Sequence, residues 1–117
     1  MNKILNTHAP IEPDDVFVAD SPTSLGNMLG YNLADRGEAI LISRPVYGRF
    51  EVDYGVEAGV KIFYADTSTE EAFSPSAVEK YEQALIASED QGIKIRAVLL
   101  VNPHNPVGEL IAQRLLM

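Results

Sequence analysis

Cysteine is absent from this 117-residue chain, and so is any long hydrophobic run. The absence of cysteine excludes both disulfide bonds and thiolate chemistry. The longest purely aliphatic run, residues 97–101, is far shorter than the roughly 20 apolar residues that a membrane-spanning helix needs. The N-terminal stretch lacks the apolar core and the small-residue cleavage site of a signal peptide. We therefore expect a soluble, cytoplasmic protein.

Basic residues are also few in this sequence. Lysine and arginine together number 9, against 17 aspartates and glutamates, which gives a formal net charge of -8. The basic residues are scattered along the chain, and this argues against nucleic acid or an anionic membrane as a partner. With 46% hydrophobic and 22% charged residues, the composition is that of an ordinary globular domain. The length allows one domain with a modest core.

Four apolar runs predict strands, at residues 16–19, 39–42, 60–65 and 95–101. The stretch 97–101 has no polar interruption and is rich in β-branched residues. Such a run is typical of a strand that is buried on both faces of a parallel sheet.

Helical signals lie between these runs. One helix is predicted after the cap residues 20–24, ending near Gly37, and a short one over residues 50–58. The clearest begins with Ser74 as a cap and Pro75 at the first helical position. Its apolar stripe consists of Val78, Tyr81, Leu85 and Ile86. Strands that alternate with helices predict an α/β fold with right-handed crossovers and a mostly parallel sheet.

Three loops at predicted strand ends carry unusual residues: SPTS from Ser21, RPVYG from Arg44 and NPHNPVG from Asn102. The two prolines of the last loop hold Asn102 and Asn105 in extended or turn geometry. The carboxyl ends of parallel strands share one edge of a sheet, where open α/β folds bind ligands. The three loops are therefore predicted to converge on one site.

The motifs SPTS, RPVYGRF and NPHNPVG, at this spacing, resemble the large domain of fold-type I pyridoxal-phosphate enzymes, the class I and II aminotransferases. Within them the sequence most resembles the 1-aminocyclopropane-1-carboxylate synthase-like branch, including its fungal members. The resemblance implies a partial three-layer α/β/α large domain over residues 14–108. Residues 1–13 are then a lead-in segment, and residues 109–117 form a divergent tail.

The resemblance also implies roles for two of the loops. Asn105 matches the amide that donates to the phenolic oxygen of the cofactor, a neutral and directional donor. Tyr47 matches the aromatic residue that stacks on the pyridine ring. The residues alone leave simpler alternatives open, in which the Asn-Pro steps only form a turn and Tyr47 is a core tyrosine at a strand end.

The SPTS loop matches the phosphate-binding turn of the family, so Thr23 and Pro22 are the remaining candidates for cofactor binding. A helix N-terminus favours an anion, and the Thr23 hydroxyl adds a donor. Ser21 and Pro22 stand where the family has glycine and a small residue, and Pro22 has no N–H to donate. The alternative is that residues 21–24 form only a helix cap.

The family's Schiff-base lysine lies beyond the stretch that this sequence resembles, and none of Lys3, Lys61, Lys80 and Lys94 matches it. No catalytic residue is therefore assigned, and we expect a truncated product or a fragment of a larger enzyme. His8 and His104 are isolated and are expected to be exposed loop residues, and no metal site is predicted. A nucleotide-binding Rossmann domain is disfavoured because no glycine-rich phosphate motif follows a strand.

The resemblance therefore implies a pyridoxal-phosphate-binding portion of an enzyme that acts on amino acids or S-adenosylmethionine-like substrates. That enzyme is expected to be a homodimer, and the chain alone is expected to be inactive. The alternative is a non-catalytic remnant or interaction module that binds no cofactor.

Overall fold

Three parallel strands form the centre of the computed structural model, which describes residues 9–111. Strand β1 (Ala39–Ser43) lies between β2 (Lys61–Ala65) and β3 (Ile95–Val98), so that the order is β2-β1-β3. Because β1 has a hydrogen-bonded partner on each side, all five of its residues are buried. The predicted α/β fold with a parallel sheet is confirmed.

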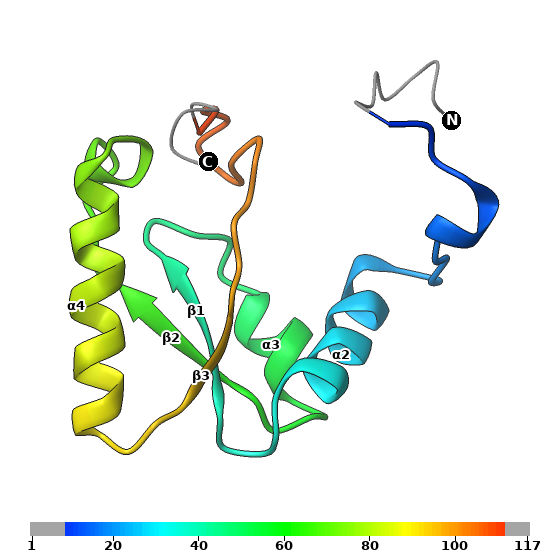
Figure 1. Cartoon of the computed structure of the whole chain (residues 1–117), viewed down its shortest axis with the longest axis horizontal. Coiled ribbons are helices and arrows are strands. Elements are labelled where there is room, and N and C mark those ends of the chain that lie inside the picture. Colours follow the sequence, from blue (N-terminus) through cyan, green and yellow to red (C-terminus); the bar gives the residue numbers. More distant parts are fainter. Residues whose placement is uncertain (1–8, 112–117) are drawn as a thin grey trace.

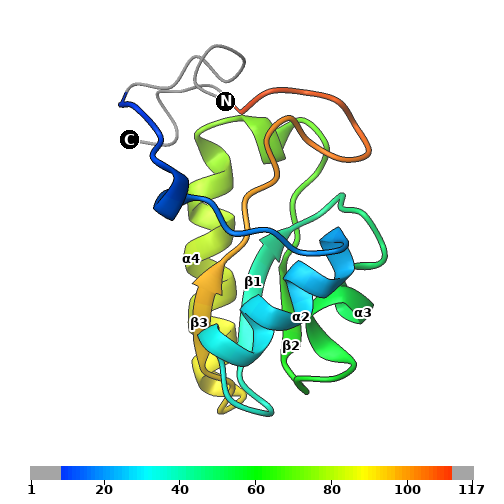
Figure 2. The same cartoon turned by 90° about the vertical axis from the view of Figure 1, so that its right-hand side faces the viewer.

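Helices cover both faces of this sheet (Figures 1 and 2). Helices α2 (Pro22–Leu33) and α3 (Phe50–Gly55) lie on one face, and α4 (Ser76–Asp90) lies on the other. Two short 3-10 helices, η1 (Pro13–Asp15) and η2 (Glu71–Phe73), precede α2 and α4. The result is a small three-layer α/β/α unit. No helix within the described residues is both long and apolar enough to cross a membrane.

The core consists of two apolar clusters, one on each face of β1. Ile40 packs with Ala58 and Val60 on the side of α2 and α3, whereas Leu41 packs with Ala65 and Ala84 on the side of α4. Successive residues of a strand point to opposite faces, so β1 supplies the centre of both clusters. The unbroken apolar run at residues 39–42 is explained by this double burial.

The strand predicted at residues 16–19 is wrong. This segment is irregular, and the side chains of Phe17 and Val18 are 69% and 82% exposed. A strand needs the backbone donors and acceptors of a neighbour, and no strand of the described sheet pairs with these residues. An apolar run is therefore not sufficient to predict a strand.

The last predicted strand is shorter and more exposed than expected. Its regular pairing ends at Val98, and the side chains of Val98 and Leu100 are 51% and 49% exposed. The reason is that β3 is an edge strand, paired with β1 on one side only. An irregularity in the β1–β3 register, beside Arg96, adds a residue to β3.

The helix predicted after Ser74 is present as α4, but the side chains that it buries are not those of the predicted apolar stripe. The helix begins at Ser76 with Pro75 as its N-cap, one position later than expected. Ala77, Ala84 and Ser88 are its buried residues. Three members of the predicted stripe are exposed, namely Val78 at 54%, Leu85 at 39% and Ile86 at 62%. Among residues 9–111 the sheet beneath α4 has three strands, which is too narrow to cover the whole stripe.

Two glycines allow α2 and α3 to approach closely. A Cβ on Gly26 would lie 2.9 Å from the Asp53 carbonyl oxygen, and one on Gly30 would lie 2.7 Å from that of Tyr54. Backbone atoms cannot move aside as a flexible side chain can. The sequence GNMLG therefore sets the spacing between the two helices.

We predict that Gly30→Ala lowers the free energy of unfolding by about 1–3 kcal/mol, because the added methyl group overpacks the α2–α3 contact. Alanine is the better helix former by roughly 1 kcal/mol, so a destabilisation shows that the contact outweighs this preference. Urea unfolding measures the change. The control is Gly48→Ala, where a Cβ meets no atom within 4 Å. A stabilised Gly30→Ala variant would contradict the close approach.

Candidate functional site

Two of the three predicted loops leave neighbouring strands at the same edge of the sheet. Strands β1 and β3 are parallel partners. The motif RPVYG follows β1 directly, and NPHNPVG follows β3 after three intervening residues. Figure 1 shows both loops beyond the end to which the strands point. Parallel pairing therefore brings the segments that carry Tyr47 and Asn105 to one edge.

The loop after β1 is tied to the end of β2 through Arg44. The Arg44 backbone N–H donates to the Ala65 carbonyl at 3.0 Å, and its own carbonyl accepts from the Thr67 hydroxyl. Its guanidinium donates to the Asp66 carboxylate at 2.8 Å and lies 3.9 Å from the centre of the Tyr64 ring. These contacts hold the RPVYG loop at its first residue.

Tyr64 extends this network to helix α3. Its hydroxyl donates to the Glu51 carboxylate at 2.7 Å. Burial of the phenol, followed by the hydrogen bond and the negative charge of Glu51, raises the pKa of Tyr64 to about 12, against a smaller opposing effect of Arg44. The network therefore favours the protonated phenol and links the first residue of the RPVYG segment to α3, which begins after it.

Tyr47 lies in the middle of that segment, where it packs against α3. Its ring meets Phe50 edge to face at a centroid distance of 5.7 Å, and Phe50 meets Tyr54 in the same way at 6.0 Å. The Tyr47 side chain is 39% exposed. It is therefore a partly open aromatic surface next to the first turn of α3, not a fully buried core tyrosine.

The SPTS segment forms the start of α2 in the way that the cap alternative describes. Ser21 is the N-cap, and its side chain accepts from the Ser24 backbone N–H at 3.1 Å, with Pro22 at the first helical position. The Ser24 hydroxyl, and then the backbone N–H groups of Asp20 and Ser21, hold the pKa of the Asp20 carboxyl below its usual value. A carboxylate thus lies against the donors at this helix start.

Thr23 turns away from these donors and toward α3. Its hydroxyl donates to the carboxylate of Asp53 at 2.9 Å, and Asp53 is only 7% exposed. A buried carboxylate needs hydrogen-bond partners, so this contact joins the two helices in addition to the close glycine contacts.

The NPHNPVG loop folds back on itself. The His104 N–H donates to the Glu109 carbonyl at 2.9 Å, and the Gly108 N–H donates to the His104 carbonyl at 2.7 Å. The Ile111 N–H donates to the side chain of Asn102 at 3.0 Å. These bonds make residues 102–111 a closed loop.

The prediction that His104 is an exposed loop residue is wrong. His104 is 7% exposed, and its ring packs edge to face on Phe73 at 5.1 Å. Its Nδ1 atom has no hydrogen-bond partner among the described residues. The contact attaches the NPHNPVG loop to η2, on the α4 side of the sheet. His8 lies outside the described residues.

The predicted site residues are thus only partly assembled. Thr23 and Tyr47 both lie against α3, and Pro22 lies beside Thr23 at the start of α2. Asn105 is exposed on the loop after β3. Sequence reasoning missed three structural residues near these loops, namely Asp53, Tyr64 and His104. His104 lies within the NPHNPVG motif, but no local signal marks the contacts of any of the three, since each acts through a partner that is distant in sequence.

The model of the family described as aminotransferase class I and II matches residues 3–116. The chain belongs to the aminotransferase class I and II family. Membership confirms the family resemblance that RPVYG and NPHNPVG indicated, and it agrees with the three layers of the structure. Proteins of this family typically use pyridoxal phosphate.

Curated relatives carry names from the branch that the sequence resembles. The 1-aminocyclopropane-1-carboxylate synthase 7 of Arabidopsis thaliana is 31% identical, over 99% of this chain and 26% of its own length. The 1-aminocyclopropane-1-carboxylate synthase-like protein 1 of Bos taurus is 34% identical, over 87% of this chain and 21% of its own length.

A third relative, from Homo sapiens, is named a probable inactive 1-aminocyclopropane-1-carboxylate synthase-like protein 2. It is 30% identical, over 92% of this chain and 20% of its own length. The chain therefore spans about a fifth to a quarter of the length of these relatives.

We predict that Thr23→Val lowers the free energy of unfolding by about 1–3 kcal/mol, because it leaves the buried Asp53 carboxylate without this donor. Thr23→Ser keeps the hydroxyl and is expected to retain most of the stability. Chemical denaturation measures both, with Thr69→Val in an exposed turn as the matched control. Equal effects of Thr23→Val and Thr69→Val would show that the Thr23–Asp53 bond contributes nothing.

A second prediction concerns Tyr64, whose pKa of about 12 in the folded chain exceeds the usual tyrosine value of about 10. The folded state holds this proton more tightly, so the stabilisation is complete below pH ~10 and is lost as the pH rises toward 12. Phenolate absorbance during an alkaline titration follows the group. Glu51→Gln is expected to shift the transition to lower pH, whereas Glu57→Gln is not. Identical titrations for both variants would disprove the role of Glu51.

Proposed function

We propose that this chain forms part of the pyridoxal-phosphate site of an enzyme related to 1-aminocyclopropane-1-carboxylate synthase. The observation that carries the proposal is the shared edge of β1 and β3, from which the loops bearing Tyr47 and Asn105 emerge. The substrates of the whole enzyme are then amino acids or S-adenosylmethionine-like compounds, and the whole enzyme is a homodimer. The chain alone is expected to be inactive.

The residues present fit the ring of the cofactor. Tyr47 has an exposed aromatic surface, and Asn105 is exposed with no hydrogen bond to its side chain from residues 9–111. Both lie on loops anchored to the scaffold, one through Arg44 and the other through His104. Anchored loops can orient a flat ligand with little loss of conformational entropy.

The phosphate side fits less well in this conformation. Pro22 has no N–H, the Ser24 N–H is bonded to Ser21, and the Thr23 hydroxyl is bonded to Asp53. The Asp20 carboxylate adds a negative charge at the same helix start. Phosphate binding through Thr23 and Pro22 would require these contacts to rearrange, so we expect weak affinity.

Pyridoxal phosphate, when bound, supplies an electron sink for chemistry at the α-carbon of an amino acid. The contribution of this chain is to bind and orient. The ring of Tyr47 would pack on the pyridine face, and the Asn105 amide would donate an N–H to the phenolic oxygen. Neither residue transfers a proton in this scheme.

No described lysine lies where it could carry the cofactor covalently. Lys61 opens β2 and Lys94 precedes β3, so both lie at the opposite edge of the sheet. Lys80 is on α4, 3.8 Å from the Glu71 carboxylate. Lys3 lies outside the described residues. Turnover therefore requires groups from beyond this segment of the family.

A second candidate function is a non-catalytic module that binds no cofactor. It is favoured by the internal hydrogen bonds that occupy the start of α2. The two candidates differ in one measurable property, which is whether the chain binds pyridoxal phosphate at all.

Titration with pyridoxal phosphate, followed by induced circular dichroism of the cofactor, tests the proposal. We expect saturable binding in the millimolar range. Tyr47→Ala is expected to weaken it about 3–10-fold, since an aromatic contact is worth about 0.5–1.5 kcal/mol. Asn105→Ala is expected to have an effect of similar size, and Tyr31→Ala on the exposed side of α2 is the control. No signal at millimolar cofactor would favour the second candidate.

Borohydride reduction of the mixture provides a separate test of inactivity. We expect no lysine to be modified selectively and no transamination. A stable adduct on one specific lysine, together with turnover of an amino acid, would show that the chain is a complete catalyst and would refute its assignment as a part.

A further inference from the structure

The NPHNPVG loop has a single buried side chain, and it belongs to the residue directly before Asn105. Of residues 102–110, His104 alone is buried, at 7% exposure, and all the others are exposed. A loop whose other side chains face water obtains little support from them. The burial of His104 is therefore the main source of packing for this loop.

The backbone of His104 is held on both sides as well. Its N–H donates to the Glu109 carbonyl at 2.9 Å, and its own carbonyl accepts from the Gly108 N–H at 2.7 Å. The His104 carbonyl and the Asn105 N–H belong to one planar peptide group. The bond from Gly108 to this carbonyl therefore fixes the plane of the peptide that leads into Asn105.

Asn105 itself has few other constraints. Pro106 restricts the backbone of Asn105 to extended or turn geometry. Among residues 9–111 no hydrogen bond restrains the Asn105 side chain. The location of its amide is therefore determined by the backbone on either side, and on the N-terminal side that backbone is His104.

The ring of His104 attaches the loop to the rest of the molecule. It meets the Phe73 ring edge to face at a centroid distance of 5.1 Å. Phe73 ends η2, a turn that is closed by the bond from the Ser74 N–H to the Glu71 carbonyl at 2.9 Å. The partner of His104 thus lies on a hydrogen-bonded turn and not on a free loop.

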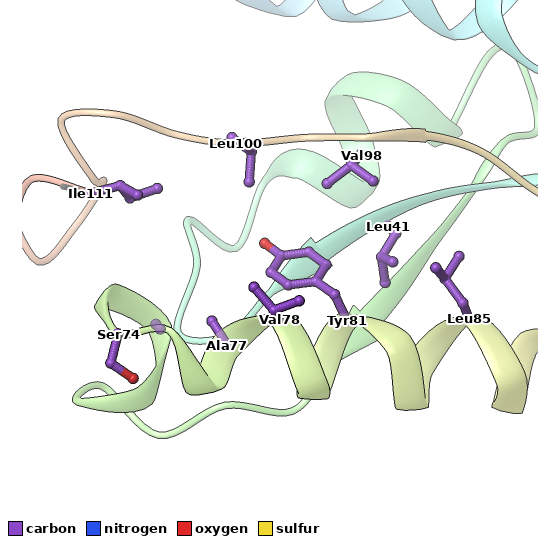
Figure 3. Close-up of a pocket in the computed structure, with 10 residues that line it drawn as sticks. Leu41, Ser74, Ala77, Val78, Tyr81, Leu85, Val98, Leu100 and Ile111 are labelled. Atoms are coloured by element: carbon purple, nitrogen blue, oxygen red, sulfur yellow. The ribbon is translucent and has the colours of Figure 1, made fainter. Parts of the chain in front are cut away.

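The continuation of β3 is separated from α4 by a cavity of about 230 Å³. Figure 3 shows Val98 and Leu100 on one side of this cavity and Tyr81 on the other. Side chains that face a cavity have no partner atoms across it and gain little attraction there. The contact between His104 and Phe73 therefore carries much of the attachment of the loop on this side of the sheet.

We propose that His104 is the positioning residue for Asn105. Its ring attaches the loop to Phe73, and its backbone bonds hold the peptide group in front of Asn105 at the carboxyl edge of the sheet. This role rests on the proposed function, in which Asn105 donates to the cofactor. The Nδ1 atom of His104 has no hydrogen-bond partner among residues 9–111, so the ring contact and not that atom supports the arrangement.

A double-mutant cycle on pyridoxal-phosphate affinity tests whether His104 acts through Asn105. His104→Ala is expected to weaken binding about 3–10-fold, as Asn105→Ala does. In an Asn105→Ala background it is expected to cause no further loss, because the group that it positions is gone. His104→Phe keeps an aromatic ring against Phe73 and is expected to retain the natural affinity. Losses that multiply in the double variant, or equal losses for His104→Ala and His104→Phe, would overturn the proposal.

Hydrogen exchange measured by NMR without cofactor follows the loop itself. His104→Ala is expected to speed exchange of the Gly108 N–H about tenfold, whereas the Leu99 N–H, bonded to the Leu41 carbonyl, stays protected. An unchanged rate at Gly108, or an equal rise at both amides, would overturn the proposal. Absence of cofactor binding by the natural chain would instead refute the proposed function, and the exchange rates would still decide whether His104 holds the loop.

Phe73→Ala removes the same ring contact without changing the loop, and it decides the matter if His104→Ala unfolds the chain. It is expected to speed exchange at Gly108 and to weaken cofactor binding as His104→Ala does. The matched control is Phe17→Ala, at a side chain that is 69% exposed, and it is expected to change neither property. Equal Gly108 exchange rates in the two phenylalanine variants would overturn the proposal.

Discussion

The pairing of β1 with both of its neighbours is the constraint on which the rest of this structure depends. It buries all five residues of β1 and makes Ile40 and Leu41 the centres of two separate clusters. Helix α3 packs over one of these faces and α4 over the other, and α2 packs against α3. The same pairing brings the loops after β1 and β3 to one edge, so the core and the candidate site have a common origin.

The two candidate loops are held in different ways. Arg44 and Tyr64 tie the RPVYG segment to β2 and α3 through charged and aromatic contacts. The NPHNPVG segment is closed by its own hydrogen bonds and attached through the buried ring of His104. The start of α2 differs from both, because its donors serve the helix and α3. The loops proposed to orient the ring and the helix start proposed to bind the phosphate are thus held by separate sets of contacts.

The sequence was sufficient to predict elements whose signals are local. The apolar run at residues 39–42 predicted a buried strand correctly, and the cap at Ser21 is the alternative that the sequence left open for residues 21–24, because backbone chemistry within a few residues determines both. The prediction of a strand at residues 16–19 was wrong because strand formation depends on a neighbouring strand. The predicted burial of side chains on β3 and α4 was wrong for a related reason. The burial of these side chains depends on how many strands lie beside them in the sheet.

The candidate site residues likewise divide into those whose positions follow from local sequence and those whose contacts join distant segments. The positions of Tyr47 and Asn105 at strand ends follow from the order of the elements. The bond between Thr23 and Asp53, and the burial of His104 on Phe73, join residues far apart in the chain and could not be found by spacing alone. Family membership supplies candidate roles, but the hydrogen bonds of an individual chain determine which groups are free to act.

The strand order also has a consequence for synthesis on the ribosome. The central strand β1 is made before either of its partners, and β2 and β3 follow with α3 and α4 between them. Until residues 95–98 emerge, one side of the most apolar strand has no hydrogen-bonded neighbour. The nascent chain therefore passes through a stage in which β1 is a target for chaperones or for misplaced pairing with other chains.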